Sequence, residues 1–150
     1  MNHVHQQIEI DAPVEHVFEL ASRSEKHRDW NPNKELFNVS GPLNHVGTTY
    51  DSILDLAATS TPSRGTVVEV RQLLLIHIHE IGQHDTSDWT YGFDRSGSKT
   101  LFSVDIDYER SGLLSGVVDR LVWHGAMEKA ALRMVERLKS LSEATVPMHA

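Results

Sequence analysis

The chain has 150 residues, of which 39% are hydrophobic and 23% charged, and this balance is typical of one globular domain rather than of a disordered chain. Its formal charge of −7 disfavours binding to nucleic acid or anionic membranes, because both carry negative charge. The chain has no cysteine, which excludes disulfides and thiolate chemistry, and no apolar run suits a signal peptide or a membrane helix, so we expect a cytoplasmic protein without stable membrane insertion.

The first predicted elements are a strand and two short helices. Residues 3–10 alternate between polar and apolar, which predicts a strand with one wet face. Asp11-Ala12-Pro13 then begins a helix, because proline suits the first helical position. The polar stretch 22–31 predicts a second short helix, which ends before Pro32 because the residue preceding a proline avoids helical geometry.

A series of strands follows between residues 35 and 110. We expect them at 36–39, 49–56, 67–70, 73–81, 89–94 and 102–109. Short loops separate them, which indicates an antiparallel meander with one apolar face that needs a single cover. A long amphipathic helix over 114–142 supplies that cover. We therefore expect one domain over residues 1–143 and a flexible tail over 144–150.

Two segments carry a resemblance to a known family. IEIDAPVEHVFELASRSEKHRDWNP resembles the opening of the polyketide cyclase/dehydrase and lipid-transport family, within the START and Bet v 1-like (SRPBCC) superfamily. Residues 89–109 are similar to the last hairpin of that family. The order of elements is that of the α+β helix-grip fold, in which a seven-stranded curved antiparallel sheet wraps around a long C-terminal helix, with two short helices after the first strand. The resemblance implies a cavity between sheet and helix.

The candidate ligand-binding residues are the side chains that share the inward parity of the strands, together with residues of the helices. They are Trp30, Tyr50, Ser52, Leu54, Trp89, Tyr91, Phe93, Phe102, Val104, Ile106, Tyr108, Leu121, His124 and Met127. Aromatic walls with a few hydroxyls suit a flat apolar ligand. The alternative is that these side chains simply fill the core.

Three side chains are candidate catalytic acids or bases. His124 lies on the apolar stripe of the long helix, Tyr50 has inward parity, and Glu80 shares the parity of Ile76 and Ile78. For Glu80 the alternatives are a carboxylate held among apolar neighbours and one that reaches water at the strand end, and we expect the second. No nucleotide fingerprint or phosphate-binding glycine loop is present, so we expect no cofactor.

Two His-x-His pairs, His3/His5 and His77/His79, have a spacing that can ligate a metal on one face of a strand. The two strands should lie three strand spacings apart, or roughly 14 Å, so the pairs should not share an ion. We expect each pair to form a solvated face and no metal to be bound. A bulge near Gln72 would reverse the parity and turn His77 and His79 inward.

Three functions remain open, because function resides in the site rather than in the fold. The first is a binding module for a small hydrophobic molecule such as a lipid, polyketide, quinone or steroid-like compound. The second is a cyclase or dehydratase that uses an acid or base in the same cavity. The third is a protein-interaction domain whose pocket is filled by side chains. We expect a monomer or a homodimer.

Overall fold

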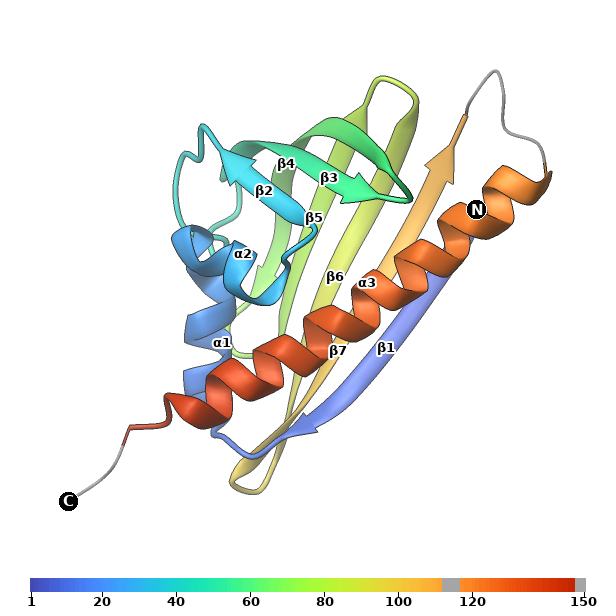
Figure 1. Ribbon diagram of the computed structural model, residues 1–150. Helices are drawn as coiled ribbons and strands as arrows, with labels where there is room; N and C mark the ends of the chain where they lie inside the picture. The colour runs from blue at the N-terminus through green and yellow to red at the C-terminus, as the bar shows by residue number, and fades with distance from the viewer. Residues whose placement is uncertain (112–116, 148–150) are drawn as a thin grey trace.

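A strongly curved antiparallel sheet holds one long helix against its concave side in the computed structural model, which describes residues 1–111 and 117–147 (Figure 1). The strands are β1 (Asn2–Ile10), β2 (Lys34–Phe37), β3 (Thr49–Leu56), β4 (Thr59–Arg71), β5 (Leu75–Gly82), β6 (Asp85–Ser96) and β7 (Lys99–Arg110). The helices are α1 (Val14–Ser22), α2 (His27–Trp30), which follows a 3-10 turn at Ser24–Lys26, and α3 (Val117–Ala144). This order confirms the expected helix-grip fold. The expected helix residues 114–116 and tail residues 148–150 lie outside the described residues.

The seven strands form one sheet in the order β1-β7-β6-β5-β4-β3-β2, with every neighbouring pair antiparallel. Strands β2 to β7 are therefore the expected six-strand meander, and β1 returns to pair with β7 along its length. The chain from β1 to β2 contains α1 and α2, and both pack against α3. The early helices thus cover one end of the concave face, beside the C-terminal half of α3 (Figure 1).

Alternation along the strands separates a buried concave face from a wetter convex face. On β6 and β7 the inward side chains are the ones expected: Trp89, Tyr91, Phe93, Phe102, Val104, Ile106 and Tyr108. The register shift in the β4–β5 pair falls between Val67 and Glu69, so a bulge lies in β4 rather than near Gln72. The parity of β5 is therefore unbroken, and His77 and His79 face outward.

Helix α3 packs on the sheet through an apolar stripe that differs from the expected one at its beginning. The buried stripe consists of Trp123, Met127, Ala130, Ala131, Met134, Val135 and Leu138. Leu121 is 68% exposed, because it lies two positions before Trp123 and so about 200° around the helix. Leu121 therefore does not face the interior, contrary to expectation. No helix within the described ranges is both long and apolar enough to cross a membrane.

Candidate functional site

The concave face gathers nearly all of the expected wall residues. Twelve of the fourteen candidates are buried: Trp30, Tyr50, Ser52, Leu54, Trp89, Tyr91, Phe93, Phe102, Val104, Ile106, Tyr108 and Met127. Of the other two, Leu121 is exposed and His124 is partly exposed. The candidate wall is thus a single surface in space, and its role as a ligand contact stays a prediction.

A charged cluster lies within this apolar wall, centred on Glu80 of β5. The Glu80 side chain is only 3% exposed, so our expectation that it reaches water is wrong. Gly65 of β4 and Ser87 of β6 are its neighbours across the sheet, and these paired strands hold the carboxylate on the concave face. Glu80 Oε2 accepts a 2.6 Å hydrogen bond from Lys34 Nζ and another from the hydroxyl of Tyr50. Burying a carboxylate costs free energy unless the charge is paired, so these two donors stabilise the buried side chain of Glu80.

Lys34 is the residue of this cluster that the sequence did not reveal. It is the first residue of β2, its side chain is 1% exposed, and its Nζ lies 3.5 Å from the centroid of the Trp89 ring. Burial lowers the pKa of the Lys34 amine, while the Glu80 carboxylate opposes that shift. Its shared parity with Leu36 was the one signal that Lys34 faces inward. Nothing in the sequence indicates its partner, which lies 46 positions away.

Tyr50 reaches Glu80 because β4 has a glycine under its ring. A Cβ atom at Gly65 would lie 2.3 Å from Tyr50 Cζ and 2.6 Å from its hydroxyl oxygen. Burial, followed by the charge of Glu80, raises the pKa of Tyr50 well above its ordinary value. The phenol is therefore a neutral donor to the carboxylate. Ser63 extends the cluster, since its hydroxyl lies 3.4 Å from Glu80 Oε1 and 2.8 Å from the hydroxyl of Ser52.

Beside the charged cluster lies an aromatic layer that contains unpaired donors. His27 and Trp30 of α2 pack edge to face, and Trp30 does the same with Tyr91. Burial, with a smaller contribution from the charge of Lys34, lowers the pKa of His27 to about 3, so its ring is neutral. His27 Nε2 accepts a hydrogen bond from Asn31, which leaves the proton on Nδ1. Among the described residues, neither His27 Nδ1 nor Trp30 Nε1 has a hydrogen-bond partner.

Among the described residues, the interior beside Glu80 is closely filled. The cavity beside Glu80 measures about 10 Å³, roughly the space of one water molecule. Its lining includes Leu54, Trp89, Tyr108 and Met127. A filled pocket is the feature that we expected of a protein-interaction domain. A ligand larger than water that bound at this cavity would therefore have to displace side chains or separate α3 from the sheet.

A surface groove of about 460 Å³ lies close to this small cavity. Residues 55–60, which form the β3–β4 turn with its flanking positions, line one side, and Ala126 and Ala130 of α3 line the other. Leu54 and Met127 line the inner cavity, whereas their neighbours along the same elements, Leu56 and Ala130, line the groove. Neighbouring side chains of β3 and α3 thus line the groove on one side and the cavity on the other.

His124 belongs to the rim rather than to the Glu80 cluster. Its Nδ1 lies 2.8 Å from the hydroxyl of Tyr108, and its Nε2 lies 3.0 Å from Glu128. Its side chain is 33% exposed. Tyr108 also lines the small cavity, so it is the residue that connects His124 to the Glu80 side of the interior.

The two His-x-His pairs lie on the convex face, away from this interior. His77 and His79 both contact the same carboxylate oxygen of Asp88, at 2.8 and 2.9 Å. His3 and His5 lie on β1 beside Asp105 and Asp107 of β7. Strands β7 and β6 separate β1 from β5, which confirms that the two pairs are three strand spacings apart.

Comparisons with solved structures support the fold. The Thermus thermophilus protein TTHA0849 is 17% identical, with a TM-score of 0.77 over 97% of this chain and 100% of that one. The Zhui aromatase/cyclase from a Streptomyces species is 12% identical, with a TM-score of 0.79 over 97% of this chain and 99% of that one. Major latex-like protein 151 from Panax ginseng is 14% identical, with a TM-score of 0.66 over 94% and 97% of the two chains.

No curated protein matches the sequence. The family model described as polyketide cyclase/dehydrase and lipid transport matches residues 1–143, which include the charged cluster, the aromatic layer and most of α3. This match covers nearly the whole chain and agrees with the resemblance of its opening segment and last hairpin. The chain belongs to the polyketide cyclase/dehydrase and lipid transport family.

Proposed function

We propose that this protein binds a small hydrophobic molecule that carries an oxygen function, between the concave face of the sheet and α3. The observation that supports the proposal is the buried cluster of Lys34, Tyr50 and Glu80 within an aromatic wall. In a core that serves only for packing, well-packed apolar residues are often at least as stabilising as a buried ion pair. A polar cluster among aromatic rings is what fixes the orientation of a flat apolar ligand.

The unpaired donors favour a ligand with an acceptor oxygen. Buried N–H groups are paired in most proteins, and a donor left without a partner costs about 1–3 kcal/mol. His27 Nδ1 and Trp30 Nε1 are two such donors on the same short helix. A carbonyl or hydroxyl oxygen that reached either one would recover part of that cost. Polyketides, quinones and steroid-like compounds all have such oxygens beside a rigid apolar skeleton.

The groove between the β3–β4 turn and α3 is the access route in this proposal. Replacing Ala126 by Trp would fill the groove, whereas the same change at Leu132 would add a ring to the exposed side of α3. We expect Ala126→Trp to slow ligand association at least tenfold in stopped-flow fluorescence and Leu132→Trp to leave it unchanged. Equal association rates for the two variants would contradict this route.

Catalysis of the cyclase or dehydratase kind is the second candidate, and the same cluster is the observation that favours it. Glu80 could accept a proton from a carbon beside a carbonyl group, with the Lys34 ammonium group hydrogen-bonded to the same carboxylate. Tyr50 donates its one hydroxyl hydrogen to Glu80, and once Glu80 has taken the proton this hydrogen could turn to the oxygen on which charge develops. His124 lies at the rim, and we propose for it at most a contact with the ligand.

Native mass spectrometry of gently purified, tag-free protein is the first test, followed by titration with flat hydroxylated aromatic ketones while the tryptophan fluorescence is recorded. We expect saturable binding that Tyr50→Phe weakens about fivefold, since one buried hydrogen bond contributes about 1 kcal/mol. The matched control is Asp88→Asn on the convex face, which should not change the affinity.

The double variant Lys34→Met/Glu80→Gln separates the two candidates, because it removes the proposed base without leaving a buried charge unpaired. A carrier should keep its affinity with little change, whereas an enzyme should lose turnover of the bound compound while still binding it. If no compound binds to the wild-type protein, or if Tyr50→Phe and Asp88→Asn behave alike, the proposal is wrong. The filled interior would then favour the protein-interaction domain.

A further inference from the structure

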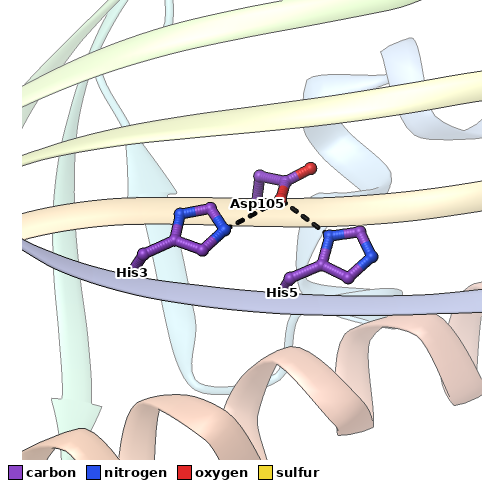
Figure 2. Close-up of side chains that lie close together, drawn as sticks. All are labelled: His3, His5 and Asp105. Carbon is purple, nitrogen blue, oxygen red and sulfur yellow. Dashed lines mark hydrogen bonds and ion pairs between the residues drawn. The ribbon is translucent and has the colours of Figure 1, made fainter.

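Three side chains that could bind a metal ion lie close together on the convex face, at the edge of the sheet. His3 and His5 of β1 both point toward the carboxylate of Asp105 on β7 (Figure 2). His3 Nε2 lies 3.3 Å from Asp105 Oδ1, and His5 Nδ1 lies 2.7 Å from the same atom. The three ligand atoms lie within 4.8 Å of one another. An ion bound about 2.0–2.2 Å from each atom would require a separation of this order.

The strand geometry explains why these three side chains meet. Residues two apart on a strand lie on the same face, so His3 and His5 project together from β1. The register pairs His5 with Asp105, and it pairs His3 with Asp107. Both imidazoles are about half exposed, with side-chain exposures of 53% and 45%, so an ion could reach them directly from solvent.

The second nitrogen of each ring also has an acceptor beside it. His3 Nδ1 lies 2.6 Å from Asp107 Oδ1, and His5 Nε2 lies 3.3 Å from Gln7 Oε1. A carboxylate only accepts hydrogen bonds, and a neutral imidazole carries a single N–H. With an ion between the rings and Asp105, this N–H would be donated to Asp107 or Gln7, and the other nitrogen would present its lone pair to the ion. Metal-binding histidines typically have such an outer partner, which fixes the tautomer and the ring orientation.

The other His-x-His pair also meets one carboxylate, that of Asp88, but it is not among the groups of described residues whose ligand atoms all lie within 4.8 Å of one another. His77 and His79 contact Asp88 Oδ1 with one ring nitrogen each. Within residues 1–111 and 117–147, however, the group of His3, His5 and Asp105 is the one set of three potential ligands whose atoms all lie within 4.8 Å. His77 and His79 are therefore a matched control for nonspecific metal binding by exposed histidines.

We propose that His3, His5 and Asp105 form a binding site for a divalent transition-metal ion of the zinc type, with its fourth position open to water. Two imidazoles and one carboxylate are ligands that Zn²⁺ accepts in tetrahedral sites with an open position, whereas Mg²⁺ and Ca²⁺ prefer oxygen ligands throughout. The ion would join the edge strand β1 to β7, so it would bind the folded chain and stabilise it.

The test is isothermal titration calorimetry of tag-free, chelator-treated protein with ZnCl₂, together with thermal unfolding in the presence and absence of Zn²⁺. We expect one high-affinity Zn²⁺ per chain and a raised melting temperature. The variant His3→Gln/His5→Gln should lose this binding and the thermal shift, and His77→Gln/His79→Gln should keep both. Asp107→Ala should weaken binding about tenfold through its effect on the His3 ring. MgCl₂ should produce neither effect.

Three results would overturn the proposal. One is the absence of saturable Zn²⁺ binding to the wild-type protein. Another is an equal loss of affinity in the two histidine double variants, which would indicate diffuse binding by surface imidazoles. The third is unchanged binding in a variant Asp105→Asn that unfolds at the wild-type temperature. Because all these residues are on the convex face, each result is independent of ligand binding in the interior.

Discussion

Replacing Lys34 by Met is the perturbation that most directly tests the buried cluster. The change keeps an unbranched chain of similar length beside Trp89 but removes the ammonium group, so that Glu80 keeps only its hydroxyl partners. Removing one partner from a buried ion pair costs about 3–5 kcal/mol, because the remaining charge is left uncompensated. For a chain of this size, such a loss lowers the melting temperature by roughly 10 °C.

Urea unfolding followed by tryptophan fluorescence measures this cost, and two further variants make it specific. Lys99→Met removes a lysine from an exposed pair with Glu9, so it should cost less than about 1 kcal/mol. The double variant Lys34→Met/Glu80→Gln removes both charges and keeps an acceptor for Tyr50. We expect it to recover at least about 2 kcal/mol relative to Lys34→Met alone.

Two results would refute this reasoning. If Lys34→Met cost no more than Lys99→Met, Glu80 would not need the ammonium group inside the protein. If the double variant were as unstable as the sum of its two single variants, Lys34 and Glu80 would not be coupled at all. In either case the cluster would not be a paired charge held in an apolar wall, and the proposed anchor for a ligand would lose its basis.

Three other predictions concern His27, Gly65 and the β3–β4 turn. With a folded pKa of about 3 against an ordinary 6.5, His27 binds fewer protons in the folded than in the unfolded chain between these values, so stability falls as the pH drops below 6.5. In urea unfolding, the free energy of unfolding should be about 2 kcal/mol lower at pH 5 than at neutral pH, and His27→Gln should remove this difference. Gly65→Ala should displace the ring of Tyr50 and cost about 2 kcal/mol, whereas Gly125→Ala, with open space at its Cβ, should not lower the melting temperature. Replacing Ala57-Ala58 by Asn-Gly should raise the free energy of unfolding by about 1 kcal/mol in the same assay, because both alanines have positive φ.

The fold was predictable from the sequence because its periodicities are strong. The alternation of Trp89, Tyr91 and Phe93 and of the following strand can be satisfied on only one face of a sheet. The beginning of α3 was less predictable, because apolar residues occur on more than one side of it. Leu121 and Val122 are exposed beside the buried Trp123, and only the packed sheet determines which of them is covered.

The candidate site was predictable in part, and its missing member shows why. Glu80 and Tyr50 were identified from strand parity alone, which requires only local information. Lys34 was missed because lysine at the start of a short edge strand normally extends into water, and its burial depends on Glu80 and Trp89 from two other strands. Our prediction that Glu80 reaches water was wrong for the same reason. Without a buried partner such as Lys34, a carboxylate at that position would extend into solvent.

The filled interior sets a condition on any ligand that binds there. If the closed form predominates, the apparent affinity equals the intrinsic affinity multiplied by the fraction of open molecules, and each 1.4 kcal/mol of opening energy weakens binding tenfold. The β3–β4 turn is the place where opening should cost least, because Ala57 and Ala58 occupy the left-handed region at φ values of 51° and 61°. Glycine and asparagine relieve such strain, yet the chain has alanine at both positions beside the groove. A less stable turn beside the groove, together with buried donors in the aromatic layer that would gain from a ligand oxygen, supports a pocket that opens when a ligand binds.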